Sequence, residues 1–271
     1  MTEQTGRQRI AAAFAQARAE QRAALLSYLT LGYPTPDLSL ALLEAAAAGG
    51  ADLLELGVPF SDPLADGPVI QRATHAALQQ GMTVARCLEM ADWLRQRGIR
   101  TPFLLMGYYN PILAYGEEAF CRDCARTGVD GLIVPDLPPE EGESLEEACG
   151  RHGLGLVYLL APTSPPERLR LVIERSQGFV YLVSVTGITG PRERLPADLA
   201  AFIARVRAAT DKPLAVGFGI ATPEQARQVA ALADGVIVGS ALVRMAAEEG
   251  AEEKVGSFVG ALRREMGRQR G

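Results

Sequence analysis

Residues 51–70 have the sequence ADLLELGVPFSDPLADGPVI, which combines an apolar run with acidic residues in a strand and a loop. It begins with a short apolar run that predicts a buried strand, interrupted by one carboxylate, Glu55. The chain then turns through a loop that carries Asp62 and Asp66, and a Gly-Pro pair opens a helix. A carboxylate in a buried strand costs free energy unless it is paired or has a chemical role. Two carboxylates in unlike surroundings can take different pKa values, so that one acts as an acid while the other stays ionised.

A purely structural interpretation of this stretch is also open. Glu55 can be a core acid that accepts a hydrogen bond from a backbone amide, and Asp62 and Asp66 can be turn formers or a helix cap. The segment by itself does not decide between structure and catalysis. The rest of the chain favours catalysis, because strongly perturbed acids gather at functional sites.

Composition and charge restrict the class of protein. The chain has 271 residues, of which 48% are hydrophobic and 22% charged, which suits two average domains or one barrel of roughly 250 residues. Its net charge of −5 argues against nucleic acid as the main partner. No apolar run approaches the roughly 18 residues of a membrane span, and the N-terminus lacks the features of a secretory signal. We therefore expect no membrane association and a cytoplasmic location.

Apolar runs alternate with helical patterns along the whole chain. Residues 7–20 predict a helix, and eight strand-like runs follow at residues 25–30, 52–56, 103–106, 131–134, 155–159, 180–183, 214–216 and 235–238. Predicted helices occupy residues 38–48, 69–79 with 84–97, 117–126, 139–152, 166–175, 196–208, 223–231 and 242–268. Continuous apolar strands are typical of parallel sheets covered on both faces. We predict an α/β fold over residues 1–271, a single (β/α)8 TIM barrel with an extra N-terminal helix and additional helices in the loops.

Three of the predicted strands begin alike, in the sequences AGGADLLEL, TGVDGLIV and LADGVIV. Each places a small residue and then an aspartate before the apolar run, which is typical of a turn that ends one helix and starts the next strand. This pattern concerns stability at the N-terminal face of the barrel. Catalytic groups of such barrels lie at the opposite face, where Glu55, Asp66, Asp136 and Thr189 are expected.

Glycines after the last strands predict a phosphate site. Gly219 follows the seventh strand, and Gly239 and Ser240 follow the eighth. Glycines let backbone N–H groups approach an anion, and a helix N-terminus adds its positive dipole. The long segment after the sixth strand, residues 184–195, carries Thr189 and Gly190 and suits a lid, with a simple exposed connection as the alternative.

Scarce residue types narrow the chemistry. The two lysines, Lys212 and Lys254, do not follow a strand, so no candidate remains for a Schiff base at the catalytic face. The two histidines fall within predicted helices, so a histidine-built metal site is not expected. Cys121 and Cys124 form a C-x-x-C pair inside a predicted helix and are interpreted as packing residues. The remaining possibility is carboxylate acid–base catalysis on a phosphorylated small molecule.

The residues also resemble a known family, the tryptophan synthase alpha chains. The match rests on LLELGVPFSDPLADGP at 53–68 and extends over SYLTLGYP at 27–34, MGYYNP at 106–111, VPDLP at 134–138, YLVS at 181–184, TGITG at 186–190, VGFGI at 216–220 and VGS at 238–240. It covers essentially the whole chain, and the long acidic motif is its most specific part.

The resemblance implies a TIM barrel that cleaves indole-3-glycerol phosphate to indole and glyceraldehyde 3-phosphate by a retro-aldol step. It implies no metal and no cofactor in this chain, with pyridoxal phosphate only in a beta chain that receives indole through a tunnel in an α2β2 complex. By position, Glu55 would be the acid–base residue that protonates indole C3. Asp66 would bond the indole N–H and stabilise positive charge on the ring.

The resemblance assigns further residues to substrate binding. Tyr181 would lie near the catalytic acid and Thr189 would belong to the lid, while Gly190, Gly219, Gly239 and Ser240 would hold the phosphate and Tyr28 and Leu105 would line the indole pocket. Asp62 is interpreted as a loop and partner-contact residue.

Three alternatives remain open at this point. The first is a stand-alone indole-3-glycerol-phosphate lyase with the same chemistry and no beta partner. The second is another phosphate-binding barrel enzyme, such as a sugar-phosphate isomerase, which would not explain the acidic loop. The third is a regulatory or scaffolding barrel, against which the two carboxylates Glu55 and Asp66 argue.

Overall fold

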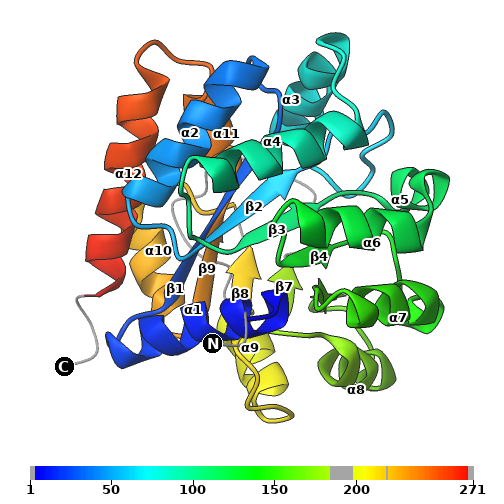
Figure 1. Ribbon diagram of the computed structural model, residues 1–271. Helices are drawn as coiled ribbons and strands as arrows, with labels where there is room; N and C mark the ends of the chain where they lie inside the picture. The colour runs from blue at the N-terminus through cyan, green and yellow to red at the C-terminus, as the bar shows by residue number, and fades with distance from the viewer. Residues whose placement is uncertain (1–3, 184–197, 218, 268–271) are drawn as a thin grey trace.

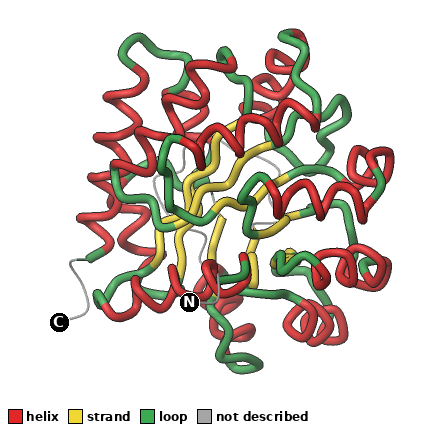
Figure 2. The backbone as a smooth tube through the Cα atoms, in the orientation of Figure 1, coloured by secondary structure: helices red, strands yellow, loops and turns green. Residues whose placement is uncertain are grey.

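The chain folds as a barrel of parallel strands surrounded by helices (Figures 1 and 2). The computed structural model describes residues 4–183, 198–217 and 219–267. Its strands are β1 (Ala24–Thr30), β2 (Leu53–Gly57), β3 (Phe103–Met106), β4 (Gly131–Ile133), β5 (Gly155–Val157), β6 (Leu159–Leu160), β7 (Val180–Val183), β8 (Leu214–Gly217) and β9 (Gly235–Val238).

Helices follow the strands in the order that the sequence predicts. They are α1 (Gly6–Ala19), α2 (Pro36–Ala48), α3 (Pro68–Gln79), α4 (Val84–Gln96), α5 (Tyr109–Tyr115), α6 (Glu117–Arg126), the 3-10 turn η1 (Pro139–Glu141), α7 (Glu143–Arg151), α8 (Pro166–Arg175), α9 (Leu199–Arg207), α10 (Pro223–Ala230), α11 (Ser240–Met245) and α12 (Ala251–Met266). Within the described residues, no helix is long and apolar enough to cross a membrane.

The described strands pair in the order β5-β4-β3-β2-β1-β9-β8-β7-β6, and every pair is parallel. The two outer members, β5 and β6, are consecutive pieces of one chain segment separated by Tyr158. The Tyr158 N–H donates to the Ser176 side chain at 3.1 Å instead of a neighbouring strand, which interrupts the ladder. The prediction of one continuous strand over residues 155–159 was therefore wrong at this residue, although both pieces belong to the closing strand of the barrel.

Two predicted helices are also divided. The helix predicted over residues 139–152 breaks at Gly142 into η1 and α7. The last predicted helix breaks between α11 and α12, where Gly250 has a left-handed backbone with φ of 69°. The short helix α5, which begins directly after β3 at Tyr109, is not among the predicted helices.

Among the described residues, alternating side chains of the strands contribute to two large apolar cores, and a third, small cluster joins Tyr28 of β1 to Ala73 and Val243. One core fills the barrel interior with residues such as Leu26, Leu53 and Leu104, and the other lies between the strands and the surrounding helices. Helix α1 contributes Ile10 and Phe14 to the interior core. It lies across the N-terminal ends of the strands and closes the bottom of the barrel (Figure 1). The opposite end, where the strands terminate, is the face at which enzymes with this fold carry their catalytic groups.

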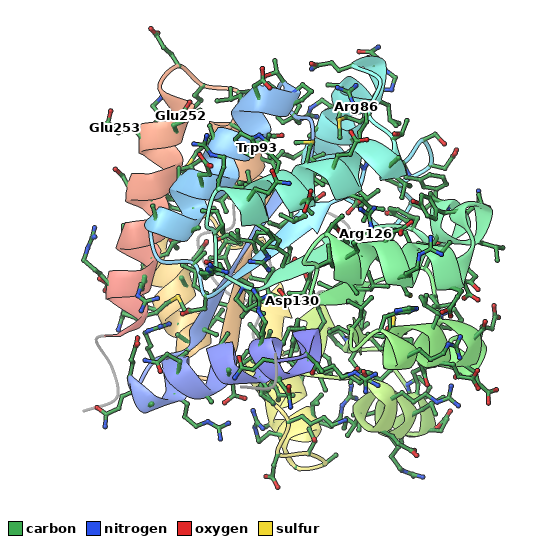
Figure 3. The ribbon with its side chains drawn as sticks, in the orientation of Figure 1. Arg86, Trp93, Arg126, Asp130, Glu252 and Glu253 are labelled. Atoms are coloured by element: carbon green, nitrogen blue, oxygen red, sulfur yellow. The ribbon has the colours of Figure 1, made fainter. Side chains whose placement is uncertain are left out.

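The aspartates of the three repeated strand starts join neighbouring strands at the N-terminal face. Asp52, Asp130 and Asp234 each accept a hydrogen bond from the N–H of a residue in the strand before, at 2.7, 2.7 and 2.9 Å. Each also pairs with an arginine. Asp130 lies in the interior beside α1, whereas Glu252 and Glu253 lie on the outside of α12 (Figure 3). The repeated aspartate thus has a structural role, as its position predicts.

Candidate active site

Glu55 lies inside the barrel, near the end of β2. Its neighbours Leu54 and Leu56 belong to the outer core and Leu53 belongs to the inner core, so side-chain alternation directs Glu55 inward. Its side chain is 0% exposed, and neither carboxylate oxygen has a hydrogen-bond partner among the described residues. Desolvation by burial raises the pKa of Glu55 to about 8. The carboxyl group is therefore mostly protonated at neutral pH.

Asp66 lies on the loop between β2 and α3 and is partly buried. The hydroxyl of Tyr108 donates a hydrogen bond to its Oδ2 atom at 3.0 Å. Burial raises the pKa of Asp66 to about 6, and the hydrogen bond from Tyr108 opposes this shift because it favours the charged form. Asp66 is therefore mostly ionised at neutral pH. One loop and one strand thus supply two carboxyl groups in opposite protonation states.

Two tyrosines from other strands share this region. Tyr28 pairs in register with Glu55 across β1 and β2, and Tyr181 lies in β7 within the inner core. Burial raises the pKa of both tyrosines, and the charges of Glu55 and Asp66 raise it further. The structure therefore places Tyr28 and Tyr181 close enough to Glu55 and Asp66 for their charges to interact.

Glycines at two strand ends make room for these rings. A Cβ atom on Gly57 would lie 2.2 Å from the Tyr28 hydroxyl, and one on Gly217 would lie 2.9 Å from the Tyr181 hydroxyl. Such distances are too short for any larger residue without displacing the ring. These glycines keep the tyrosine hydroxyls at the end of the barrel that carries the carboxylates.

Three of the four predicted phosphate residues lie at two adjacent strand ends. Gly219 follows β8, and Gly239 and Ser240 follow β9, which pairs with β8. Gly219 has a left-handed backbone with φ of 66°, and no described atom lies within 4 Å of the position of a Cβ atom there. Among the described residues, no atom therefore blocks the approach of an anion to this side of the Gly219 backbone. Thr189 and Gly190 lie outside the described residues.

The side chain of Leu105 points to the outside of the barrel, whereas Glu55 and Tyr181 point to its interior. Its side chain packs in the outer core, near Val58 and Tyr108, whereas Leu104 belongs to the inner core. Since side chains alternate along a strand, the inward position of β3 at the level of Glu55 is Leu104. The resemblance assigns Leu105 to the indole pocket, whereas in this structure Leu104 is the residue of β3 that points into the barrel beside Glu55.

The remaining candidates have simple environments. Asp62 is exposed and accepts a hydrogen bond from the Ser61 hydroxyl at 2.5 Å. Cys121 and Cys124 are buried in the outer core, which confirms their interpretation as packing residues. Among the described residues, no group of three or more histidine, cysteine, aspartate or glutamate side chains is arranged to hold a metal ion.

Tyr108 was not among the predicted site residues, yet it contacts Asp66 directly. It follows β3 by two residues and precedes α5. A polar aromatic side chain just after a predicted barrel strand is the signal that could have identified it. The contact itself joins two loops that are 42 residues apart, so the sequence does not predict it.

Comparisons with known proteins agree with this geometry. A sequence profile described as "Tryptophan synthase alpha chain" matches residues 14–266. The tryptophan synthase alpha chain of Dehalococcoides mccartyi is 48% identical over 247 residues, which cover 91% of this chain and 96% of that protein. The corresponding chain of Gluconacetobacter diazotrophicus is 53% identical over 235 residues, covering 87% of this chain and 86% of that protein.

Solved structures of tryptophan synthases also superpose on this chain over nearly its whole length. A Mycobacterium tuberculosis tryptophan synthase structure superposes with a TM-score of 0.89 at 41% identity, covering 97% of this chain and 99% of the other. The alpha chain from Legionella pneumophila also superposes with a TM-score of 0.89, at 37% identity, covering 97% and 98% of the two chains.

Proposed function

Because the chain belongs to the tryptophan synthase alpha chain family, we propose that Glu55 and Asp66 carry out the acid–base chemistry of that family's reaction. The protein is a lyase of tryptophan biosynthesis that cleaves indole-3-glycerol phosphate to indole and glyceraldehyde 3-phosphate. The reaction breaks a carbon–carbon bond, and the electron pair of that bond needs an acceptor. A protonated indole ring is such an acceptor, so one acid has to deliver a proton to indole C3.

Glu55 is the proposed proton donor. Its pKa of about 8 means that the carboxyl group holds a proton at neutral pH, when the substrate binds. Transfer of this proton to indole C3 forms an iminium-like ring. The resulting carboxylate then accepts the proton of the glycerol hydroxyl as the carbon–carbon bond breaks, which returns electrons to the ring and leaves an aldehyde. Glu55 ends the cycle protonated, as it began.

Asp66 is the proposed stabiliser of the charged ring. Its pKa of about 6 leaves it ionised at neutral pH, and an anion beside the indole N–H favours the positive charge that develops there. The observation that carries the whole proposal is the contrast between the two carboxyl groups. One is enclosed by the barrel without a described hydrogen-bond partner, and the other lies in the loop and accepts a hydrogen bond.

The rest of the substrate is proposed to bind around these two groups. Tyr28 and Tyr181 border the reacting ring, and their burial beside Glu55 and Asp66 supports this assignment. The phosphate is assigned to Gly190, Gly219, Gly239 and Ser240, supported by the adjacent ends of β8 and β9. Thr189 is assigned to a segment that closes over Asp66.

A tryptophan synthase beta chain is the proposed partner, in an α2β2 complex. The pyridoxal phosphate of the overall enzyme is assigned to that beta chain, and no cofactor is assigned to this one. To test this, indole release from indole-3-glycerol phosphate is measured with the purified chain, alone and with a beta chain. We expect a slow rate that rises strongly with the partner. A fast rate that ignores the partner would instead indicate a stand-alone lyase.

The role of Asp66 is tested by Asp66→Asn, with Asp62→Asn as the matched control in the same loop. Loss of the charge beside the ring is expected to lower kcat by about 10² or more, the scale measured for groups that stabilise transition-state charge. Binding of glycerol phosphate, measured by calorimetry, should be unchanged, and Asp62→Asn should retain the activity of the isolated chain because Asp62 is exposed and is interpreted as a contact for the partner, not for the substrate. A loss of glycerol phosphate affinity in Asp66→Asn would make Asp66 a structural residue.

A further inference from the structure

Tyr108 occupies the junction between two loops at the catalytic end of the barrel. It follows β3 and is buried, and its ring packs against Phe60 with centroids 5.3 Å apart. Its hydroxyl makes two hydrogen bonds at once. It donates to Asp66 Oδ2 at 3.0 Å and accepts the backbone N–H of Ala65 at 3.0 Å.

The backbone on either side of Tyr108 is itself held in place. The Gly107 N–H donates to the Ile133 carbonyl at 3.1 Å, and the Tyr109 N–H donates to Asp136 Oδ1 at 2.9 Å. On the other side of the contact, the Val58 N–H donates to the Met106 carbonyl at 2.8 Å. The Tyr108 hydroxyl therefore projects from a rigid strand end into the more exposed loop that carries Asp66.

We propose that Tyr108 is the positioning residue for Asp66: its hydroxyl holds the loop by accepting the Ala65 N–H and directs the Asp66 carboxylate by donating to Oδ2. This inference rests on the proposed function, in which Asp66 acts as an anion beside the indole ring. The donated bond leaves Oδ1 as the oxygen available to the substrate N–H. The accepted bond ties the loop to β3, so the carboxylate is held in place before the substrate binds.

The hydrogen bond also acts on the charge of Asp66. Among the described residues, the ionisable groups that interact with it are Tyr28 from β1, Tyr181 from β7 and Tyr108 itself, and Tyr108 also faces the charge of Asp136. Of these, Tyr108 is the one with a hydrogen bond to the carboxylate. Burial raises the pKa of Asp66 to about 6, and the Tyr108 hydroxyl limits that rise. Without the hydroxyl, the carboxylate would be ionised only at a higher pH.

The test is Tyr108→Phe, which keeps the ring against Phe60 and removes only the hydroxyl. With a beta chain present, kcat at pH 7 should fall on the order of 10-fold, the scale of one hydrogen bond to a charged group, while KM changes little. The acidic limb of the kcat profile should move up by about one pH unit, with activity partly recovered toward pH 8. Tyr109→Phe is the matched control, because its hydroxyl donates to Glu117 at 2.8 Å, away from Asp66.

A double-mutant cycle separates positioning from a general structural effect. If Tyr108 acts through Asp66, then Tyr108→Phe in an Asp66→Asn background should lower kcat much less than in the wild type. Equal effects in both backgrounds, or an unmoved acidic limb in Tyr108→Phe, would overturn the inference. Asp66→Asn alone tests the proposed function separately, because wild-type activity in that single variant would remove Asp66 from the mechanism whatever Tyr108 does.

Discussion

At the scale of single residues, Glu55 has the most informative environment in the described part of the chain. A carboxyl group in a buried strand costs free energy when charged, and the folded protein lowers that cost by keeping the group protonated. The same protonation is what the proposed chemistry requires of an acid at neutral pH. The proposed catalytic role of Glu55 and the electrostatic cost of its charged form therefore have one physical cause, the burial of this side chain.

Glu55→Gln is expected to abolish most activity and to stabilise the fold at alkaline pH. Loss of a general acid–base should lower kcat by roughly 10²–10⁴. The folded-state pKa of about 8 lies above the ordinary value of 4.5, so between these values the folded wild type binds one proton more than the unfolded chain. The free energy of unfolding of the wild type therefore falls by at most about 1.4 kcal/mol per pH unit in this range from this group.

Urea unfolding of the wild type and of Glu55→Gln at pH 5 and pH 8 measures this pH-dependent contribution of Glu55 to the free energy of unfolding. The two proteins should differ little at pH 5, and the variant should be the more stable at pH 8. If both proteins lost equal stability between the two pH values, Glu55 would not be held protonated in the fold. Near wild-type indole release by Glu55→Gln would remove it from the mechanism.

At the scale of elements, α1 determines which end of the barrel is closed. The side chain of Phe14 packs against Phe179 with ring centroids 5.2 Å apart, and a Cβ atom on Gly178 would lie 2.7 Å from Ile10. The helix therefore fits closely over the N-terminal strand ends. The periodicity of residues 7–20 predicts the helix, but the target of its apolar face follows only from the closed barrel.

Phe14→Ala is expected to destabilise the protein without changing the chemistry. Emptying this buried site should lower the free energy of unfolding by about 3–5 kcal/mol, as for other buried aromatic residues. The folded variant should keep its kcat, because the site lies at the opposite end of the strands. Denaturant unfolding combined with the indole assay measures both quantities.

Leu232→Ala, at a position 43% exposed, is the control for the loss of an apolar side chain and should have a much smaller effect. A loss of kcat in folded Phe14→Ala would mean that α1 also influences the catalytic end.

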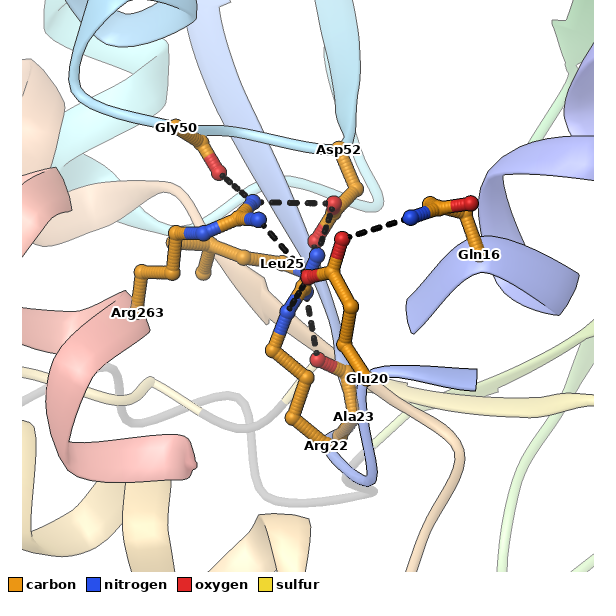
Figure 4. Close-up of polar contacts among 8 residues, drawn as sticks. All are labelled: Gln16, Glu20, Arg22, Ala23, Leu25, Gly50, Asp52 and Arg263. Atoms are coloured by element: carbon orange, nitrogen blue, oxygen red, sulfur yellow. Dashed lines mark hydrogen bonds and ion pairs between the residues drawn. The ribbon is translucent and has the colours of Figure 1, made fainter. Parts of the chain in front are cut away.

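At the scale of the whole molecule, one polar network joins the two ends of the chain (Figure 4). Arg22 donates two hydrogen bonds to Asp52, at 2.6 and 2.7 Å, and a third to Glu20. Arg263 from α12 reaches the same Asp52 at 3.1 Å and the Gly50 carbonyl at 2.8 Å. The Asp52 carboxylate, at the start of β2, therefore links a residue near the N-terminus to the last helix.

Arg22→Ala is expected to weaken this closure strongly. Both members of the Arg22–Asp52 pair are buried, so removing the cation leaves Asp52 with less compensation and should cost about 3–5 kcal/mol of unfolding free energy. Arg97→Ala removes a comparable two-bond pair with Glu44 in which the arginine is 53% exposed, and should cost about 1 kcal/mol or less. Equal losses of stability in the two variants, measured by denaturant unfolding, would contradict a special role for the Arg22 network.

Local sequence patterns determined the fold class, the family and the two candidate catalytic carboxylates of this protein. Continuous apolar runs and helical periodicity were sufficient for the barrel, since each strand must be covered on both faces and each helix must bury one stripe. The motif at residues 53–68 was sufficient for the family and for Glu55 and Asp66 as candidates. These features depend on neighbours in the sequence, so a single chain displays them.

Contacts between distant segments were decided only by the tertiary structure. The interruption of the closing strand at Tyr158 depends on Ser176, and the inward position of Leu104 instead of Leu105 depends on the register of β3. The pKa of Glu55 depends on the complete enclosure of its carboxyl group, and the bond of Tyr108 to Asp66 joins separate loops. Burial and long-range hydrogen bonds come from the whole packed barrel, so no local pattern of residues specifies them.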